Sequence, residues 1–284
     1  MSRRPHLLRL AAAGVAVAAL ALSGCASSGT PGPTESGSDE GWITPGKITI
    51  ATGEPAYYPW VIDDDPESGE GFEAAVAYAV AEQLGFDADD VVWVRTTFDE
   101  AIAPGPKDFD VNLQQFSITD ERKESVDFSS PYYETTQVVV TTGASPAADA
   151  TSIADLKDLL IGAQTGTTSY TTIESVIQPS QGAQAFNSND DAKLALENGQ
   201  VDAIVVDLPT AFYISGVELT DGVLVGQLPT PDGEKGDQFG LVLAKDSPLT
   251  EQVTAAVDAL REDGTLDELA SEWLGGEGQA PLLK

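Results

Sequence analysis

Apolar residues are spaced in two alternating ways along the chain. In residues 71–86 they recur every three or four positions, which predicts a helix that ends at Gly85. The same spacing predicts helices at 98–103, 166–177, 189–199, 249–263 and 265–275. Runs rich in β-branched residues predict strands at 47–52, 90–96, 109–115, 136–142, 159–165, 201–207 and 239–245. This alternation indicates an α/β fold with a mostly parallel sheet covered by helices.

The first 24 residues have the features of an export signal. Arginines near the start are combined with an apolar run from Leu7 to Leu22, and small residues follow it. The run is too short, and too rich in Ala and Gly, to favour a membrane span. The tetrad Leu22-Ser23-Gly24-Cys25 resembles the lipobox of bacterial lipoproteins, which implies that Cys25 is lipidated and becomes the mature N-terminus. Ordinary signal cleavage beside an incidental cysteine is the alternative.

Residues 25–41 are expected to be a flexible tether. They are rich in Ser, Gly, Pro, Thr and acidic residues and have no apolar periodicity. The folded body is expected to begin near Trp42.

The composition excludes several classes of partner, catalytic site and metal site. The formal net charge of −32 repels nucleic acid and anionic lipid headgroups, so no nucleic-acid partner is expected. Cleavage before Cys25 removes His6, the only histidine, and lipidation occupies the only thiol. Without imidazole or thiol, Ser-His-Asp and Cys-His catalysis, His- or Cys-ligated zinc and disulfides are excluded. We expect no metal and no cofactor, whereas carboxylate chemistry remains possible.

A weak internal repeat suggests two similar lobes. The segment 98–101 leads through a turn to Phe109-Asp110-Val111, and Asp190-Asp191-Ala192 leads through a turn to Val201-Asp202-Ala203. Both units are a helix, a turn and then a strand with an aspartate at its start, about 90 residues apart.

Arg122 occupies a position that local physics disfavours for a cation. Thr119 is expected to be the N-cap of a helix, so Arg122 falls in its first turn, at the positive end of the helix dipole. A guanidinium beside unpaired N–H groups forms an anion site, and Ser117 and Thr119 add hydroxyl groups. A salt bridge to one of the many acids is the alternative reading.

Two further strand ends carry polar groups. Gln164 closes a strand before Gly166-Thr167-Thr168, where hydroxyls lie beside free N–H groups, and Asp207 closes the apolar strand 201–207. Ligands of open α/β sheets bind at such carboxyl ends, although Asp207 could instead be a helix N-cap. A cation, an anion-binding helix start and a carboxylate together suit a zwitterion with an α-carboxylate and an α-ammonium group. Aromatic residues at 57–60 follow another strand, where they either cap a core edge or stack on a ligand.

With these motifs in order, the chain resembles family 3 of the bacterial extracellular solute-binding proteins, the polar amino-acid receptors of ABC importers. The resemblance rests on residues 48–86, on "SITDERKESVDFSSPYY" (117–133), on "IGAQTGTTSY" and "VDAIVVDLPTAFYI", and on "DGTLDELASEWLG". It covers about residues 47–275 in order. It implies a two-lobed, type II periplasmic-binding-protein-like fold with mixed, mostly parallel sheets, flanking helices and two hinge strands, at 136–142 and 238–244. Lobe 1 would comprise 42–139 plus 237–284, and lobe 2 would comprise 140–236.

The resemblance also implies a set of ligand-binding residues. Arg122 would bind the α-carboxylate with Thr167 and Thr168, and Asp207 and Ser117 would bind the α-ammonium group with the backbone at Gln115. Tyr57 and Phe98 would sandwich the ligand side chain, with Trp60 shaping the same wall. Glu54, Gln114 and Gln164 would face the side-chain end. Gln114 and Gln115 stand where the family commonly has small residues, which suggests a narrower or amide-lined pocket.

The expected function is therefore that of a substrate-binding lipoprotein of an ABC importer. It would be a monomer on the outer face of the bacterial cell membrane, where it captures an amino acid and delivers it to the permease and ATPase. A sensory receptor for a membrane signalling protein is the alternative, and a dehydratase-type enzyme on the same fold is a weaker one.

Overall fold

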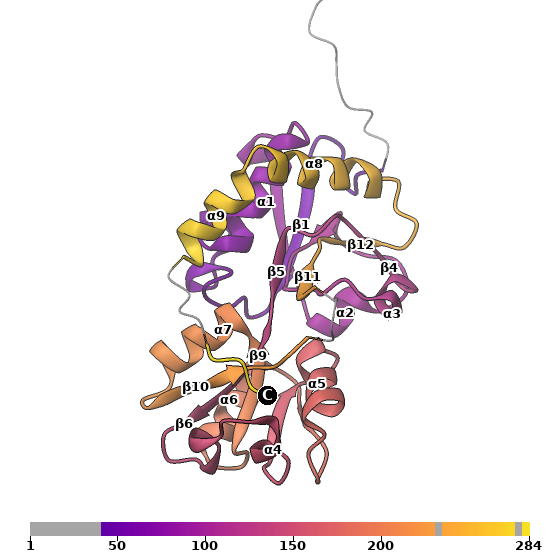
Figure 1. The fold of residues 1–284 in the computed structure, drawn as a ribbon. Helices are drawn as coiled ribbons and strands as arrows, with labels where there is room; N and C mark the ends of the chain where they lie inside the picture. Colours follow the sequence, from indigo (N-terminus) through magenta and orange to yellow (C-terminus); the bar gives the residue numbers. More distant parts are fainter. Residues whose placement is uncertain (1–40, 231–234, 276–279) are drawn as a thin grey trace, which may run out of the picture. The chain divides into compact units, whose positions relative to one another are not determined.

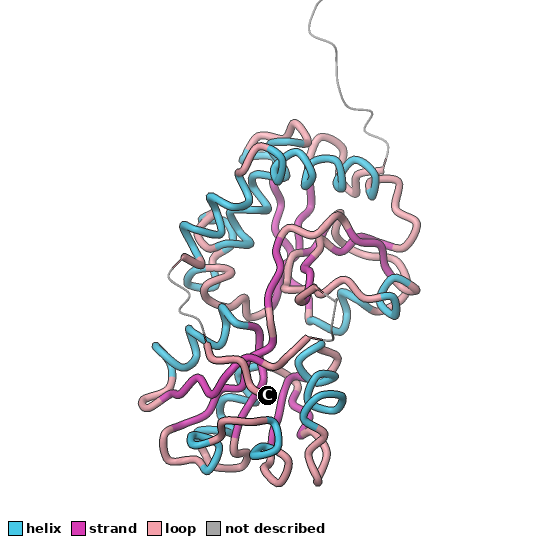
Figure 2. Tube along the Cα trace, viewed as in Figure 1, coloured by secondary structure: helices cyan, strands magenta, loops and turns pink. Residues whose placement is uncertain are grey.

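The computed structural model describes residues 41–230, 235–275 and 280–284. The export signal, Cys25 and all of the expected tether except Gly41 lie outside the described residues. The described residues belong to one compact unit. Its elements are arranged as two five-stranded sheets and a two-stranded one (Figures 1 and 2). No helix of the described ranges is both long enough and apolar enough to cross a membrane.

The first sheet has the strand order β2-β1-β3-β12-β4. Its parallel part consists of β2 (Val91–Thr96), β1 (Ile48–Gly53) and β3 (Val111–Asn112). The strand β12 (Val242–Ala244) runs antiparallel to both β3 and β4 (Val126–Phe128).

Helices cover the first sheet on both faces. The helices α1 (Phe72–Gln83), α8 (Thr250–Glu262) and α9 (Thr265–Trp273) pack on one side, where Ile48 and Ile50 of β1 join their core (Figure 1). Ala51 points to the other side, towards α2 (Phe98–Ile102). The short helix α3 (Asp120–Lys123) precedes β4. The buried face of α1 comprises Phe72, Glu73, Ala74, Val76, Ala77, Val80 and Ala81.

The second sheet has the strand order β10-β6-β9-β7-β8. Its strands are β10 (Gly222–Gln227), β6 (Gln137–Thr142), β9 (Ala203–Asp207), β7 (Ile161–Gln164) and β8 (Gln184–Phe186). Its short helices are α4 (Ile153–Leu156), α5 (Thr168–Thr172), α6 (Asn189–Glu197) and α7 (Leu208–Tyr213). Val139 and Val205 pack into one core, and Val138, Val140, Ile204 and Val206 into another on the opposite face. Burial on both faces explains why β6 and β9 are continuous apolar runs.

The two sheets are linked by a pair of strands that differs from the predicted hinge. The strands β5 (Tyr133–Thr135) and β11 (Asp237–Phe239) pair antiparallel with each other and form the two-stranded sheet. The expectation that 136–142 is a hinge strand was wrong, because β6 lies inside the second sheet between β10 and β9. The expected hinge 238–244 is divided between β11 and β12. We call β5 and β11 the linking pair.

The C-terminal segment also departs from the expected division into lobes. Leu282 forms a β-bridge with Gln227 of β10, and Leu283 is buried in a core of the second sheet. Residues 280–284 therefore pack with the second lobe, although the prediction assigned all of 237–284 to the first. Because β6 pairs within the second sheet, the chain first passes from the first lobe to the second at the end of β5. The prediction had placed this boundary between residues 139 and 140. Otherwise the proposed lobe boundaries remain a prediction.

The internal repeat corresponds to a hydrogen bond that is found in both lobes. Asp110 accepts a hydrogen bond from the backbone N–H of Thr49 (2.7 Å), and Asp202 accepts one from the backbone N–H of Leu160 (2.8 Å). Each aspartate thereby fixes the start of a neighbouring parallel strand, β1 or β7. The two lobes thus repeat one local arrangement.

Candidate ligand-binding site

A polar cavity lies between residues of the two lobes. The structure brings most of the predicted site residues to it: Tyr57, Phe98, Gln114, Gln115, Ser117, Arg122, Gln164, Thr167, Thr168 and Asp207. Ser169, Asn189 and Val206 also line the cavity and were not predicted from the sequence. Their neighbours in sequence were the available signal, since Ser169 follows Thr168 and Val206 precedes Asp207.

Arg122 is buried and contacts both lobes. Thr119 is the N-cap of α3 and accepts a hydrogen bond from the Arg122 N–H (3.2 Å). The guanidinium donates through Nη1 to the carbonyl oxygen of Ser117 (2.7 Å) and through Nη2 to that of Gly166 (2.9 Å). It also lies 5.3 Å from the centre of the Phe98 ring, a cation–π arrangement. Since α3 is a single turn, these contacts rather than a helix dipole position Arg122.

The salt-bridge alternative for Arg122 is not realised in the described part of the chain. The ion pairs within 4 Å there all involve other cations. Burial lowers the pKa of the guanidinium, whereas the charges of Asp237, Asp207 and Glu121 act in the opposite direction. Arg122 is therefore a buried cation whose strong donors face backbone carbonyls, and an incoming carboxylate can improve its environment.

The turn after β7 faces Arg122 from the second lobe. Gly166 has a φ of 73°, a left-handed conformation that favours glycine. Thr167 is the N-cap of α5, where its Oγ1 accepts from the N–H of Tyr170 (3.1 Å) and donates to the carbonyl of Gln164 (2.6 Å). The hydroxyls of Thr168 and Ser117 lie 3.1 Å apart, across the two lobes.

Asp207 occupies the N-cap position of α7, but its side chain does not cap that helix. Its carboxylate instead accepts a hydrogen bond from Gln137 Nε2 (2.8 Å). Burial, followed by the nearby charge of Asp237, raises the pKa of Asp207 to about 8. No cation of the described residues lies within ion-pair distance of this carboxyl group, although the more distant charge of Arg122 favours its ionisation, and an ammonium group would supply a closer partner.

Two aromatic side chains of the first lobe, those of Tyr57 and Phe98, border the cavity. The Phe98 ring packs on Phe116 at a centroid distance of 4.7 Å, and Phe98 starts α2 after a capping box formed by Thr97 and Glu100. Tyr57 lies in the loop after β1, and burial followed by the charge of Asp190 raises the pKa of its hydroxyl to about 12. A neutral phenol remains a hydrogen-bond donor over the whole physiological range.

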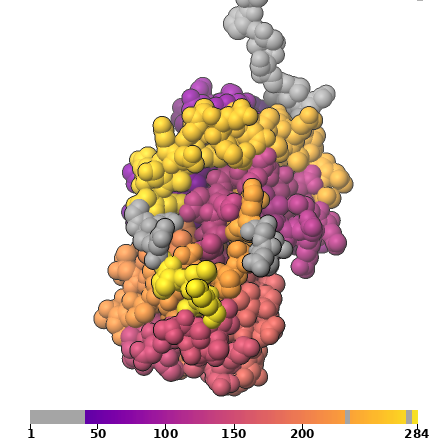
Figure 3. All heavy atoms as spheres, in the orientation of Figure 1, coloured from indigo at the N-terminus to yellow at the C-terminus, as the bar shows by residue number. Residues whose placement is uncertain are grey.

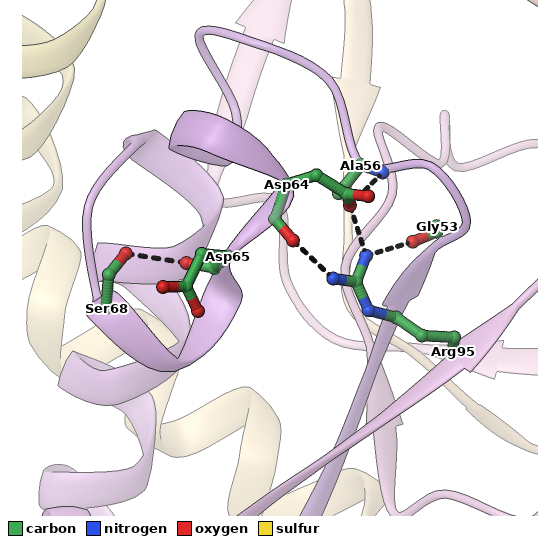
Figure 4. A network of polar contacts seen from close by, with 6 residues as sticks. All are labelled: Gly53, Ala56, Asp64, Asp65, Ser68 and Arg95. Atoms are coloured by element: carbon green, nitrogen blue, oxygen red, sulfur yellow. Dashed lines mark hydrogen bonds and ion pairs between the residues drawn. The ribbon is translucent and has the colours of Figure 1, made fainter.

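The loop that carries Tyr57 is held by Arg95 of β2 (Figure 4). Arg95 donates to the carbonyl oxygens of Gly53 (2.7 Å) and Asp64 (2.6 Å) and forms an ion pair with the Asp64 carboxylate (2.6 Å). The same carboxylate accepts from the N–H of Ala56 (2.8 Å). The start and end of the loop are therefore fastened to one strand.

Three predicted residues lie elsewhere. Trp60 is fully buried in the core of the first lobe, where its ring meets Phe72 and Phe239 rather than the cavity. Glu54 is exposed and outside the lining. Thr119 caps α3 and lines an adjacent cavity together with Arg122. An aromatic residue in a strand-exit loop can thus cap a core edge, which was the alternative left open for these positions.

Glu73 supports the lining of the cavity and was not predicted from the sequence. It is buried in α1 and accepts hydrogen bonds from the N–H of Gln115 (2.7 Å), from the amide Nε2 of Gln115 and from the hydroxyl of Tyr132. Burial raises the pKa of Glu73 to about 7, although all of these bonds oppose the shift. Gln115 has a left-handed φ of 51°, and Glu73 fixes it there. The Gln115 N–H is therefore already occupied, which limits the backbone contribution expected from this residue.

The cavity thus presents a buried guanidinium, a carboxylate of raised pKa, several hydroxyls and an aromatic pair. These groups come from two lobes that are joined by a linking pair of strands. Such an arrangement binds a small polar solute between lobes and defines a bilobed solute-binding protein.

The chain belongs to the bacterial extracellular solute-binding proteins, family 3, whose model matches residues 48–276. The resemblance seen in the sequence and the two-lobed fold are thereby confirmed. A probable histidine-binding protein of Campylobacter jejuni is 30% identical over 231 residues, covering 80% of this chain and 85% of that protein. The L-cystine-binding protein TcyJ of Escherichia coli is 31% identical over 280 residues, covering 96% of this chain and 97% of that protein.

A solved structure supports the same fold. An ancestral arginine-binding protein bound to glutamine has a TM-score of 0.67 and 30% sequence identity, and the match covers 81% of this chain and 98% of that one. These three relatives are binding proteins by name.

Proposed function

We propose that this protein captures a zwitterionic α-amino acid between its lobes and delivers it to the permease and ATPase of an ABC importer. The observation that carries the proposal is the placement of Arg122 and Asp207 on opposite lobes around one cavity. An amino acid carries the two charges that complement this pair. Because each lobe supplies one of them, a bound amino acid would stabilise the closed arrangement over an open one.

The α-carboxylate is assigned to Arg122, with the hydroxyls of Thr167 and Thr168 beside it. The α-ammonium group is assigned to Asp207, with Ser117. Burying either ligand charge without its partner would be strongly unfavourable, so this pair selects for the zwitterion.

A polar side chain fits the remaining part of the cavity best. Tyr57 and Phe98 offer ring faces there, and Gln114, Gln164 and Asn189 offer amides. The amide oxygen of Gln114 is buried without a hydrogen-bond partner, so a ligand donor would satisfy it. Relatives that are named for histidine and cystine, and the arginine-binding protein that holds glutamine, are consistent with a polar ligand.

The protein is proposed to act outside the cell as a monomer. Processing at Cys25 would give a lipid-anchored N-terminus, and residues 25–41 would tether the body to the outer face of the cell membrane. Several acyl chains on one cysteine make a stable anchor, whereas a single chain is marginal.

The rival activities make different demands on the site. A dehydratase would need a general acid or base above the substrate, and Glu54 lies outside the cavity lining. A bound amino acid recovered chemically unchanged supports binding alone. A sensory receptor would bind the same ligand, and neighbouring kinase genes rather than permease genes would indicate it.

A thermal-shift screen tests the proposal. Protein lacking the first 24 residues, with Cys25 replaced by Ser, is screened against the proteinogenic amino acids and cystine. A ligand at 100 times its dissociation constant stabilises the protein by about 2.7 kcal/mol, which is readily detected. If no amino acid raises the melting temperature, the proposal is wrong.

A further inference from the structure

A network of polar side chains connects Asp207 to the linking pair. Gln137, the first residue of β6, donates through Nε2 to Asp207 (2.8 Å) and also to Asp237 (2.6 Å), which is the first residue of β11. The side-chain oxygen of Gln137 accepts from the hydroxyl of Ser169 (2.6 Å). Because that hydroxyl donates to Oε1, the amide is fixed with its nitrogen towards the two carboxylates.

The network also lies between two cavities. Asp207 lines the ligand cavity, whereas Asp237 lines a neighbouring cavity that Gln137 also borders. Gln137 Nε2 donates to Oδ1 of the Asp207 carboxylate, so this side chain fixes the orientation of the carboxylate in the ligand cavity.

We propose that Gln137 and Asp237 are positioning residues, which orient Asp207 for the ligand's ammonium group and tie it to the linking strand β11. This inference rests on the proposed binding of an amino acid. Asp237 lies where the chain crosses between the lobes, so rotation of the lobes changes its distance from Asp207. The ammonium site is thereby complete only when the linking pair keeps Asp237 within reach of Gln137.

The electrostatics supply a distinctive readout. The groups that act on Asp207 are Asp237 and Glu73, which oppose its ionisation, and Gln137 and Arg122, which favour it. Below its pKa, Asp207 must release a proton to pair with an ammonium group, so affinity rises with pH. Removing the Asp237 charge lowers the pKa of Asp207 and moves this rise to lower pH.

The test is the pH profile of ligand affinity, measured by isothermal titration between pH 5.5 and 9. The probes are L-arginine, L-histidine, L-glutamine and L-cystine. Asp237→Asn is expected to shift the profile to lower pH by half a unit or more. Gln137→Met, which removes the bridging donor, is expected to weaken binding at least fivefold at pH 7. The double variant should show non-additive effects, since both residues act through one network.

Glu134→Gln is the matched control, because Glu134 is an exposed carboxylate on the other strand of the linking pair. It makes the same change in net charge and should leave the profile in place. Equal profiles for Asp237→Asn and the unmodified protein, in the presence of binding, would overturn this inference alone. Absence of binding by the unmodified protein to every probe would instead overturn the proposed function, and the inference with it.

A different observation carries a second inference. The C-terminal segment Ala280–Lys284, which we call the tail, lies beyond the family match and packs on the second lobe (Figure 3). The backbone of Gln227 in β10 donates to the carbonyl of Pro281 (2.8 Å) and accepts from the N–H of Leu283 (3.0 Å). The Gln227 side chain donates to the carbonyl of Ala280 (2.7 Å) and accepts from the hydroxyl of Thr136 (2.8 Å).

These contacts fasten the tail next to the linking pair. Thr136 directly follows β5, so one side chain holds both the tail and the end of a linking strand. Gly226 permits the close approach, because a Cβ there would lie 2.5 Å from the Pro281 carbonyl oxygen. The helix α9 ends at Trp273 in the first lobe, and the chain is next described in the second.

We infer that the tail restrains the opening of the lobes, because it follows α9 of the first lobe in sequence and packs on the second lobe. Removing residues 280–284 should then give a ligand-free protein with a larger radius of gyration in small-angle X-ray scattering. Gly226→Ala, which displaces the tail but keeps its length, should change the radius in the same direction. Gly216→Ala is the matched control, since a Cβ at Gly216 meets nothing within 4 Å.

The scattering measurement needs no ligand, so its outcome is independent of the proposed function. Far-ultraviolet circular dichroism and the unfolding midpoint of each variant establish that it is folded. An unchanged radius in a folded, truncated protein would overturn the inference about the tail.

Discussion

The guanidinium of Arg122 in the first lobe donates a hydrogen bond to the carbonyl oxygen of Gly166 in the second, 2.9 Å away. The same guanidinium donates to the carbonyl of Ser117 in its own lobe. The residue assigned to the ligand's carboxylate therefore also joins the two lobes. Its removal is therefore expected to affect ligand binding and lobe contact together.

Arg122→Ala is expected to weaken amino-acid binding by at least about 2 kcal/mol, or roughly 30-fold, because the ligand carboxylate loses its charged partner. Arg122→Lys should also bind weakly, since one ammonium group cannot reproduce two donors directed at different groups. Isothermal titration gives both values. Lys123→Ala is the control, because Lys123 pairs with Asp120 on the exposed side of the same helix. Near-normal affinity of Arg122→Ala would contradict the assignment.

The ligand-free protein is expected to lose stability as pH rises from about 5 to 8. The pKa of Asp207 is raised to about 8 and that of Glu73 to about 7, whereas both groups titrate near pH 4 when unfolded. Between these values the folded state holds protons that the unfolded state has released. Each such proton contributes a slope of up to about −1.4 kcal/mol per pH unit to the free energy of unfolding.

Urea unfolding at pH 5, 6, 7 and 8 measures this slope. Asp207→Asn and Glu73→Gln should each make it less negative, since neither replacement can ionise. Asp155→Asn is a suitable control, because the pKa of this exposed carboxyl is lowered and its contribution is lost only at acidic pH. Parallel stability profiles for the unmodified protein and both buried-site variants would exclude these groups as the cause.

The parts of the fold that local pattern determines could be predicted from the sequence. Gly85 ends the region of α1, and the aspartates 110 and 202 mark the starts of corresponding strands. Most of the residues that line the cavity were also predicted, because polar residues after buried strands meet at one edge of each sheet. The resemblance to a family then implied the roles that we propose for them.

The features of the fold and of the site that could not be predicted depend on contacts between segments that are distant in sequence. A β-branched run such as 136–142 indicates a buried strand, and only the pairing with β9 and β10 shows that it is not a hinge. Glu73 resembles an exposed helix acid until Gln115 and Tyr132 are placed against it. Trp60 could not be separated from Tyr57 by sequence, because burial in the core depends on Phe72 and Phe239.

Glu73→Ala is expected to destabilise the protein by about 3 kcal/mol or more, because it leaves the Gln115 N–H and the buried Tyr132 hydroxyl without an acceptor. Glu73→Gln keeps one carbonyl-type oxygen and should lose less. Urea unfolding at pH 7 compares them. Equal stabilities for the two variants would show that these hydrogen bonds do not matter to the fold.

Gly166→Ala is expected to weaken both stability and ligand binding. The left-handed φ of 73° disfavours a side chain by about 1–2 kcal/mol, and the new Cβ would lie 3.0 Å from the Asp99 carboxylate of the other lobe. Gly85→Ala provides the control, because Gly85 has a φ of 89° with open space around it. It should lose a similar amount of stability without any change in affinity. If Gly166→Ala and Gly85→Ala bind the ligand equally well, ligand binding does not depend on the close approach of Gly166 to Asp99 of the other lobe.

Thr210→Val is expected to speed ligand release. The indole Nε1 of Trp60, in the first lobe, donates to the hydroxyl of Thr210 in α7 of the second lobe (3.0 Å), and both side chains are buried. Valine keeps the shape of threonine but leaves the indole N–H without an acceptor when the lobes are together, whereas water can satisfy it when they separate. The closed state alone is destabilised, so the dissociation rate should rise about fivefold or more with little change in association rate.

Stopped-flow measurement with intrinsic tryptophan fluorescence gives both rates. Trp60→Phe, which removes the same donor, should leave Thr210→Val without further effect, and additive effects of the two substitutions would contradict this coupling.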